Sequence, residues 1–301
     1  MSARDFTLAV HGGAGNVREG EGGYARVARP GLEEALAAGG RVLASGGSAL
    51  DAVVAAVVVL EDCPVFNAGC GGVLNAQGEL ELDAALMEGT TRRAGAVAGL
   101  RGFRPVEAAR AVLEDDRHVL LAGAGADAFA REAGLAPVDA AGWITGFRRE
   151  QWRRHLAALE ADRSGGTVGA VARDGAGRLA AATSTGGILG KRPGRVSDSA
   201  LVGSGTWADD RSCAVSATGE GELFIRAAFA ARIDAALRGG VPLAAACDAA
   251  LAEVSGLGGS GGCIAVDRDG NVAMPFDTPG MPRGVLRPGG PPRVALLADP
   301  L

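Results

Sequence analysis

The pattern of apolar and polar positions gives the first half of the chain alternating strands and helices. Phe6 to Val10 form a short apolar run that ends in His11-Gly-Gly-Ala-Gly15, which predicts a strand followed by a tight turn. Apolar spacing predicts helices over residues 29–44, 49–62, 105–114 and 126–132, with a short strand over 118–121. Ser48, with Asp51 three residues later, resembles a capping box at the start of the second helix. Because that helix is apolar on nearly every face, we expect it to be buried.

The middle of the chain changes character. Trp143 to Arg163 is polar and rich in arginine and leads into Ser-Gly-Gly166, so we expect an exposed linker over about residues 145–166. Two β-like runs, Thr167 to Ala172 and Arg178 to Ser184, then flank Asp174-Gly175, which is typical of a hairpin. Further patterns predict strands over 213–217, 263–266 and 271–276 and one helix over 223–238. The second half is therefore expected to be rich in antiparallel pairs, and no internal repeat is visible.

Composition places the chain among globular proteins. It has 301 residues, of which 49 are glycine, 48 % are hydrophobic and only 4 % are aromatic. The glycines have no G-X-Y period, and the apolar content exceeds that of disordered chains, so collagen and disorder are excluded. The length allows one large domain or two ordinary ones. A core of Ala, Val and Leu with few rings favours closely packed sheets and helices.

Charge, apolar runs and cysteines narrow the possible partners. The net charge is −5, Lys191 is the only lysine and there is no basic block, so we expect no nucleic-acid partner. The longest apolar run, Ala52 to Leu60, is far shorter than the roughly 20 residues of a membrane span, and the N-terminus lacks a secretory apolar region. Five scattered cysteines without a CxxC pair indicate reduced thiols. We therefore expect a cytoplasmic protein that acts on a small molecule.

Three familiar patterns are weak on inspection. Gly258-Gly-Ser260-Gly-Gly262 matches the nucleophile elbow of α/β-hydrolases, but that fold needs a histidine after the serine, and all three histidines precede it. We interpret this segment as a flexible turn beside the core. Gly123-Ala-Gly125 resembles a dinucleotide fingerprint but lacks a repeated βαβ unit, which favours a structural strand-to-helix turn. The histidines and cysteines show no metal-ligand spacing.

A cluster of hydroxyl and charged residues follows the linker. Thr167, Thr185 and Thr218 each stand at the start or end of a predicted strand. Arg195 and Asp198 lie between them in a glycine-containing loop, and no histidine is available there as a base.

One reaction needs no histidine. If the chain is cut after Gly166, Thr167 gains an α-amine with a pKa of roughly 7.7–8.0, which suits a general base at neutral pH. An N-terminal threonine paired with its own amine is an activated nucleophile. A threonine that merely begins a strand is common, so this residue alone does not decide between the two interpretations.

Ordered motifs along the chain decide it. They are His11-Gly-Gly-Ala-Gly15, Gly47-Ser-Ala-Leu-Asp-Ala-Val53, Phe66-Asn-Ala-Gly69, Leu82-Asp-Ala-Ala-Leu-Met-Glu-Gly89, Gly166-Thr-Val-Gly-Ala-Val171, Thr183-Ser-Thr-Gly-Gly187, Pro193-Gly-Arg-Val196, Thr218-Gly-Glu-Gly-Glu222 and Gly258-Gly-Ser-Gly-Gly262. With these motifs the chain resembles, over nearly its whole length, the plant-type (type 2) L-asparaginase and isoaspartyl peptidase family of N-terminal nucleophile hydrolases. The resemblance implies an α+β fold, a four-layer αββα sandwich. It also implies that one domain, 1–301, is self-cleaved into an α subunit (1–166) and a β subunit (167–301) that assemble as (αβ)2.

The resemblance also implies roles for individual residues. Thr167 would be nucleophile and base, Thr185 would orient it, and Thr218 with the Gly219 amide would form the oxyanion hole. Arg195 would hold the substrate α-carboxylate, and Asp198 would hold the α-ammonium with help from the backbone of Gly219 or Gly221. Asn67 would support the nucleophile. No cofactor is implied for catalysis, but a structural sodium ion is implied in the loop from residue 60 to 70, held by the backbone carbonyls of Leu60, Glu61, Cys63, Phe66, Ala68 and Cys70.

The implied activity is release of L-aspartate from L-asparagine and from β-aspartyl dipeptides. A glycosylasparaginase-like enzyme is an alternative, although such relatives usually carry Asp where this chain has Gly166. A second alternative is an uncleaved member that only binds small amino acids, against which the intact Thr167, Arg195 and Asp198 argue. Glu220 departs from the smaller residue expected in its loop, and the linker is short.

Overall fold

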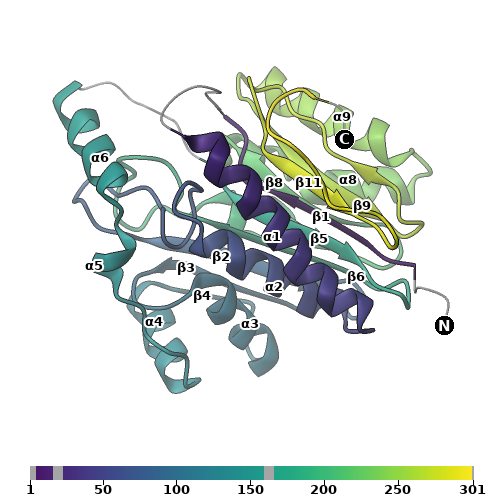
Figure 1. Ribbon diagram of the computed structural model, residues 1–301, viewed down its shortest axis with the longest axis horizontal. Coiled ribbons are helices and arrows are strands. Elements are labelled where there is room, and N and C mark those ends of the chain that lie inside the picture. The colour runs from purple at the N-terminus through teal and green to yellow at the C-terminus, as the bar shows by residue number, and fades with distance from the viewer. Residues whose placement is uncertain (1–4, 16–22, 159–165, 300–301) are drawn as a thin grey trace.

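The computed structural model describes residues 5–15, 23–158 and 166–299 and is a mixture of helices and two β-sheets (Figure 1). The last part of the predicted linker, residues 159–165, lies outside the described residues. Among the described residues, no helix is long and apolar enough to cross a membrane.

The larger sheet has the strand order β12-β11-β1-β5-β6-β2-β3-β4. All neighbours in it are antiparallel except β3 and β4, which are parallel. Its strands are β1 (Thr7–His11), β2 (Leu82–Glu88), β3 (Ala94–Leu100), β4 (Leu120–Ala122), β5 (Val168–Arg173), β6 (Leu179–Thr185), β11 (Arg283–Leu286) and β12 (Arg293–Ala295). The N-terminal strand β1 thus pairs directly with β5, the strand that follows the proposed cleavage point.

The smaller sheet is antiparallel, with the order β10-β9-β8-β7. Its strands are β7 (Thr206–Ala208), β8 (Cys213–Gly219), β9 (Gly261–Asp267) and β10 (Val272–Ala273). The two sheets contact each other, with β5 and β6 of the first against β8 of the second. Alanine and β-branched residues fill the space between them, which explains how the chain builds a core with so few aromatic rings.

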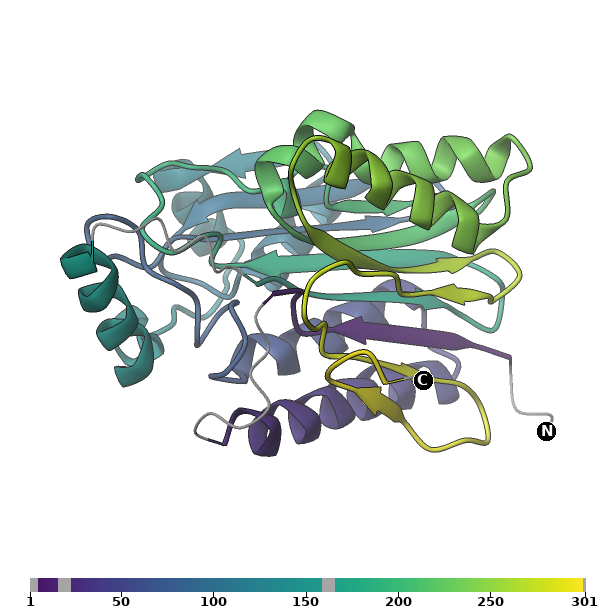
Figure 2. The same cartoon turned by 90° about the horizontal axis from the view of Figure 1, so that it is seen from above.

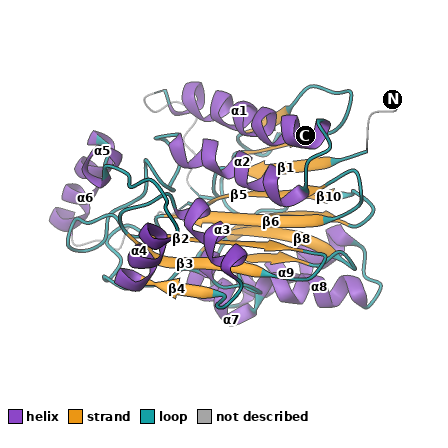
Figure 3. Ribbon diagram, turned by 90° about the horizontal axis from the view of Figure 1, so that it is seen from below, coloured by secondary structure: helices purple, strands orange, loops and turns teal. Residues whose placement is uncertain are grey.

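Helices cover the outer faces of the sheets (Figure 2). Those on the larger sheet are α1 (Tyr24–Ala44), α2 (Ala49–Asp62), α3 (Pro105–Asp115) and α4 (Gly123–Glu132). On the smaller sheet lie α8 (Phe229–Arg238) and α9 (Leu243–Gly256), preceded by α7 (Gly221–Ala227), which contacts α9. The short helices α5 (Ala140–Trp143) and α6 (Gly146–Ala158) stand away from the sheets (Figure 3), and a 3₁₀ turn, η1, spans Asp198–Ala200.

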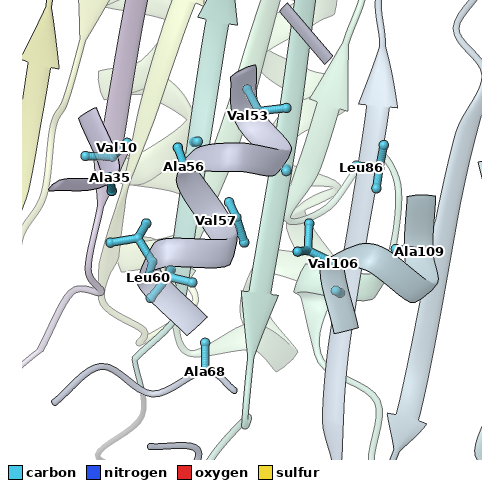
Figure 4. Packing of buried hydrophobic residues seen from close by; sticks show 14 of the residues in the cluster. Val10, Ala35, Val53, Ala56, Val57, Leu60, Ala68, Leu86, Val106 and Ala109 are labelled. Carbon is cyan, nitrogen blue, oxygen red and sulfur yellow. The ribbon is translucent and has the colours of Figure 1, made fainter. Parts of the chain in front are cut away.

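Alternation along β5 shows how the sheets place the site. Val168, Ala170 and Ala172 face the helices of the larger sheet, whereas Val171 faces the smaller sheet. Because successive side chains in a strand point to opposite faces, a strand covered on both sides reads as a continuous apolar run. Helix α2 packs on the first of these faces through Val53, Ala56, Val57 and Leu60 (Figure 4). The start of β5 is therefore held rigidly between helices and the second sheet.

Several predicted elements are confirmed. Helix α2 has the predicted bounds, and Ser48 Oγ accepts the Asp51 amide proton at its start. The hairpin around Asp174-Gly175 is the β5–β6 pair. The segment at Gly123 is a turn from β4 into α4, as expected for a structural strand-to-helix connection.

Other expectations were wrong. The helix predicted over 223–238 is two helices, because Ala228 adopts a left-handed conformation with φ of 48° and breaks it. Strands β2 and β3 and helix α9 were not predicted. Only Val272 and Ala273 form the strand expected over 271–276. The glycine segment ending at Gly262 is not wholly a turn, since β9 begins at Gly261.

The predicted linker is only partly exposed. Most side chains of α6 face solvent, but Arg148 is buried and its guanidinium donates to the backbone oxygen of Gly71. The Trp152 indole also donates to the oxygen of Asn75 at 2.9 Å. One face of α6 is therefore anchored on the loop that follows Asn67.

Candidate active site

Thr167 stands immediately before β5 and is buried, with 5 % of its surface exposed. Its hydroxyl donates to Thr185 Oγ1 at 3.2 Å. Thr185 is the last residue of β6, the strand that pairs with β5. The hairpin geometry therefore brings the two hydroxyls together, as the sequence motifs led us to expect.

The carbonyl oxygen of Gly166 has two hydrogen-bond donors. Asn67 Nδ2 and Thr185 Oγ1 each donate to it at 2.8 Å. Asn67 is itself held in place, because its Oδ1 accepts the Val73 amide proton at 2.8 Å and its Nδ2 also donates to the Gly187 oxygen at 2.7 Å. Two donors aimed at one carbonyl oxygen stabilise the negative charge that develops there during nucleophilic attack.

The turn after β1 lies close to the same peptide bond. Gly13 has a φ of +106°, and a Cβ built there would lie 3.0 Å from both Gly166 Cα and Thr167 N. A side chain at Gly13 would therefore strain its own backbone and push against the Gly166–Thr167 bond. The next residue, Ala14, donates its amide proton to Thr218 Oγ1 at 3.0 Å, which brings the end of β8 to the same place.

Thr218 and Gly219 lie at the end of β8, beside the start of β9. Thr218 is fully buried and accepts the Ala14 amide proton, so its own hydroxyl proton can donate to a substrate oxygen. Gly219 has a φ of +149°, and a Cβ there would lie 2.4 Å from the Ser260 oxygen. The close approach of β8 to β9 thus requires glycine at position 219.

Arg195 and Asp198 form a charged pair of side chains around Gly221. A Cβ at Gly221 would lie 2.6 Å from Asp198 Oδ1 and 2.9 Å from Arg195 Nη2. Among the described residues, Arg195 Nη1 and Asp198 Oδ2 are buried and have no hydrogen-bond partner. Burial raises the pKa of Asp198 to about 7, although Arg195 opposes that shift. A buried donor and a buried acceptor of opposite charge, both without partners, are suited to a zwitterionic ligand.

Glu222 orients the guanidinium of Arg195. Its two carboxylate oxygens accept from Arg195 Nε at 2.9 Å and from Nη2 at 3.0 Å. This bidentate pair occupies one edge of the guanidinium and leaves Nη1 for another ligand. Sequence reasoning missed this residue, although it ends the Thr218-Gly-Glu-Gly-Glu222 motif and stood there without a role.

Gly187 joins the threonine pair to the charged pair. Its amide donates to Thr185 Oγ1 at 2.9 Å, and its φ of +77° favours glycine. A Cβ at Gly187 would lie only 2.9 Å from Arg195 Nη1. The Arg195 guanidinium and the Thr185 hydroxyl therefore both lie beside Gly187.

A fully buried polar network lies behind Thr167. His11 Nε2 and Ser216 Oγ are 2.8 Å apart, and Ser216 Oγ lies 2.8 Å from Thr183 Oγ1. Burial lowers the pKa of His11 to about 3, so the imidazole is neutral at physiological pH. The network links β1, β8 and β6, and it lies next to β5 because His11 pairs with Gly169 in the larger sheet. The sequence offered no role for His11.

The loop suggested as a cation site begins inside α2, since Leu60 and Glu61 belong to the last turn of that helix. The Cys70 amide donates to the Glu61 oxygen at 2.7 Å, so the chain closes on itself between them. The Glu61 side chain accepts from the Val106 amide at 3.0 Å and is buried, which raises its pKa to about 8. Backbone oxygens suit a hard cation, but in this loop those of Leu60, Glu61 and Cys63 each already accept one backbone amide proton. The described residues hold no cluster of three or more His, Cys, Asp or Glu side chains suited to a metal ion.

The structure thus gathers the predicted residues in one place. Gly166, Thr167, Thr185 and Asn67 share hydrogen bonds, and Arg195, Asp198 and Gly221 meet beside them. A sequence profile of the asparaginase family (Asparaginase_2) matches residues 4–295. The chain belongs to the asparaginase family.

Similar proteins support this family assignment. The chain is 48 % identical to an isoaspartyl peptidase of Salmonella typhimurium strain LT2, over 97 % of this chain and 98 % of that protein. It is 46 % identical to an isoaspartyl peptidase of Escherichia coli strain K12, over 97 % and 96 % of the two chains. A Xenopus laevis isoaspartyl peptidase/L-asparaginase is 42 % identical over 90 % of this chain and 89 % of its own.

Proposed function

We propose that this asparaginase-family chain cleaves itself between Gly166 and Thr167 and then hydrolyses L-asparagine and β-aspartyl dipeptides, releasing L-aspartate. The observation that carries the proposal is the double hydrogen bond on the Gly166 oxygen beside the Thr167 hydroxyl. Arg195 Nη1 and Asp198 Oδ2, which have no hydrogen-bond partner in residues 5–15, 23–158 and 166–299, support the substrate class. The names of the relatives agree with both activities.

The hydrogen bonds around Gly166 support a route for self-cleavage. Thr167 Oγ1 attacks the carbonyl carbon of Gly166 while its proton passes to Thr185 Oγ1, which gives its own proton to the Gly166 oxygen. The C–N bond then breaks, and the nitrogen of Thr167 takes the proton from the Gly166 oxygen. An ester now joins Gly166 to the Thr167 side chain. Water hydrolyses the ester, which leaves a carboxylate on Gly166 and a free α-amine on Thr167. Asn67 donates to the same oxygen and stabilises the partial negative charge that develops on it while the proton is being transferred.

The new terminus then acts on the substrate. The α-amine of Thr167 takes the proton of its own hydroxyl, which attacks the side-chain carbonyl carbon of asparagine or the β-aspartyl bond. Thr218 Oγ1 and the Gly219 amide donate to the developing oxyanion. Ammonia or the amine of the second amino acid leaves with the proton. Water then hydrolyses the aspartyl ester and regenerates Thr167.

Recognition rests on the two charged side chains. Arg195 Nη1 donates to the α-carboxylate, and Asp198 Oδ2 accepts from the α-ammonium. A ligand with both groups satisfies two buried atoms at once, so analogues that lack either group lose affinity. Both proposed substrates present the same free aspartyl end, which accounts for one site acting on both.

We also propose the finer architecture of the family for this chain. The two contacting sheets with helices on their outer faces support a four-layer αββα sandwich. The chain would be one domain made of an α subunit (1–166) and a β subunit (167–301), assembled as (αβ)2. A sodium ion held by carbonyls of the loop from residue 60 to 70 would stabilise the position of Asn67.

The direct test is turnover by the purified chain after incubation at neutral pH. We expect ammonia from L-asparagine and free aspartate from β-aspartyl-leucine, each measured by a coupled assay. An N-glycosylated asparagine should react at least about tenfold more slowly, because Gly166 replaces the Asp usual in glycosylasparaginases. Absence of turnover with all three substrates would contradict the proposal, and preference for the glycosylated one would favour the alternative enzyme.

The ionisation of Asp198 predicts a pH dependence of ligand selectivity. Burial raises the pKa of Asp198 to about 7, so its side chain is mainly a charged carboxylate above that pH and mainly a neutral carboxylic acid below it. The α-ammonium of L-aspartate binds the Asp198 carboxylate, whereas succinate has no ammonium and does not depend on that carboxylate. We expect the ratio of the inhibition constants, succinate over aspartate, to fall about tenfold per pH unit below pH 7.

Taking the ratio cancels the effect of ionisation of the Thr167 α-amine, because that ionisation is expected to change both inhibition constants by the same factor. An Asp198→Asn variant should show a small ratio that does not change between pH 5.5 and 8.5. A constant ratio in the wild type over the same range would exclude Asp198 as the ammonium partner.

A further inference from the structure

The only lysine of the chain is buried beside the proposed substrate clamp. The sequence has 30 basic residues, and Lys191 alone among them is not arginine. Only 2 % of the surface of Lys191 is exposed, whereas the neighbouring Arg192 is exposed to solvent. In a chain that uses arginine at every other basic position, a buried lysine indicates a place that needs a compact ammonium group rather than a planar fork.

Hydrogen bonds fix Lys191 at both ends. Its Nζ donates to the backbone oxygen of Glu81 at 2.7 Å, and its own backbone oxygen accepts from Ala76 at 2.8 Å. Burial lowers the pKa of the ammonium, the Asp83 and Glu81 carboxylates raise it, and Arg195 lowers it.

Those carboxylates are already occupied. Asp83 accepts the amide protons of Gly99 and Ser197, both at 2.8 Å. Glu81 accepts from the Arg101 guanidinium at 2.6 Å. The Asp83 and Glu81 carboxylates lower the free-energy cost of burying the Lys191 ammonium. Each of them, however, also accepts hydrogen bonds from other donors.

Two cationic groups converge at Gly187. A Cβ built on this glycine would lie 2.9 Å from Arg195 Nη1 and 3.3 Å from Lys191 Nζ. Two like charges that share one buried point repel each other, which is unfavourable unless an anion binds between them. Gly187 also donates to Thr185 Oγ1, so this point adjoins the nucleophile.

We propose that Lys191 is the second cationic group of the α-carboxylate subsite, a specificity-determining residue that acts with Arg195. This inference rests on the proposed function, because it assigns a ligand to the same site. Arg195 Nη1 donates to the carboxylate beside Gly187, and the Lys191 ammonium, which approaches the same point, stabilises the same anion. Selection for a free α-carboxylate therefore depends on both charges.

Binding of the product L-aspartate and of its α-amide to the cleaved enzyme tests the proposal. The ligands are L-aspartate and isoasparagine, the α-amide of aspartate, which lacks only the α-carboxylate charge. By calorimetry, Lys191→Met should weaken aspartate binding about 10- to 100-fold, since it removes a charged partner of the anion. Isoasparagine, already weak, should change less than about twofold. The matched control Arg192→Met removes an exposed charge one residue away and should change neither constant by more than about twofold.

The wild-type protein offers a second measurement, in case Lys191→Met does not fold. Lysine labelled with ¹³C and ¹⁵N gives one side-chain NMR signal, because the chain has one lysine. Aspartate should shift this signal and raise the pKa read from its titration, and isoasparagine should do neither. Equal losses for both ligands in Lys191→Met, or an NMR signal that ignores aspartate, would overturn the proposal. Failure of the proposed function would instead show as a wild type without turnover.

Discussion

Thr167→Ala remains a single chain of 301 residues and releases no ammonia from asparagine, whereas the wild type resolves into chains 1–166 and 167–301. The alanine lacks the hydroxyl that attacks the Gly166 carbonyl, so neither the cut nor the new α-amine can form. Losing the nucleophile and its base together should reduce kcat/KM by at least about 10⁴-fold. Denaturing mass spectrometry after prolonged incubation at neutral pH measures the first effect, and a coupled ammonia assay measures the second.

Thr167→Ser is the matched control for this variant. It keeps the hydroxyl and the potential α-amine, so it should still cleave at the same bond and retain activity. Both variants should melt close to the wild type, because the change removes few buried atoms. Cleavage of Thr167→Ala at residue 166, or a wild type that stays whole, would refute the mechanism.

Arg195→Lys should reduce kcat/KM for asparagine by at least about 100-fold. The guanidinium uses Nε and Nη2 to hold Glu222 and keeps Nη1 for the substrate, and a single ammonium cannot reproduce this planar geometry. Steady-state kinetics should show the loss mainly in KM, because the interaction forms with the substrate as well as with the transition state.

Self-cleavage separates this effect from misfolding. The Gly166 carbonyl receives its hydrogen bonds from Asn67 and Thr185 and not from Arg195. Arg195→Lys should therefore still cleave to completion. Arg192→Lys, an exposed position three residues earlier in the same loop, should keep normal kinetics. A kcat/KM within threefold of the wild type would exclude Arg195 as the carboxylate ligand.

Local signals along the sequence predicted several elements because their causes are local. Ser48 caps α2 through a residue three positions later, and Asp174-Gly175 closes a hairpin between adjacent strands. The break at Ala228 had no such signal, because alanine ordinarily favours a continuous helix. Strands β2 and β3 are covered on their faces and so lack the alternation that marks a half-exposed strand.

The candidate site likewise has some features that the sequence predicted and others that only the structure revealed. The motifs alone named Thr167, Thr185, Arg195 and Asp198. They did not reveal that Gly13 lies against the Gly166–Thr167 bond, because more than 150 residues separate the two segments and it is the β1–β5 pairing that brings them together.

By itself, the sequence determined the chemical groups of this protein: a threonine able to become an N-terminus, an arginine and an aspartate in one loop, and a single lysine. Only the tertiary structure decided their geometry. It aimed Asn67 and Thr185 at one carbonyl and set the lysine beside Gly187. It also left Arg195 Nη1 and Asp198 Oδ2 without hydrogen-bond partners within the described part of the chain. Hydrogen bonds and charges act over a few ångströms, and strand pairing and sheet packing, not spacing along the chain, bring these groups within that range.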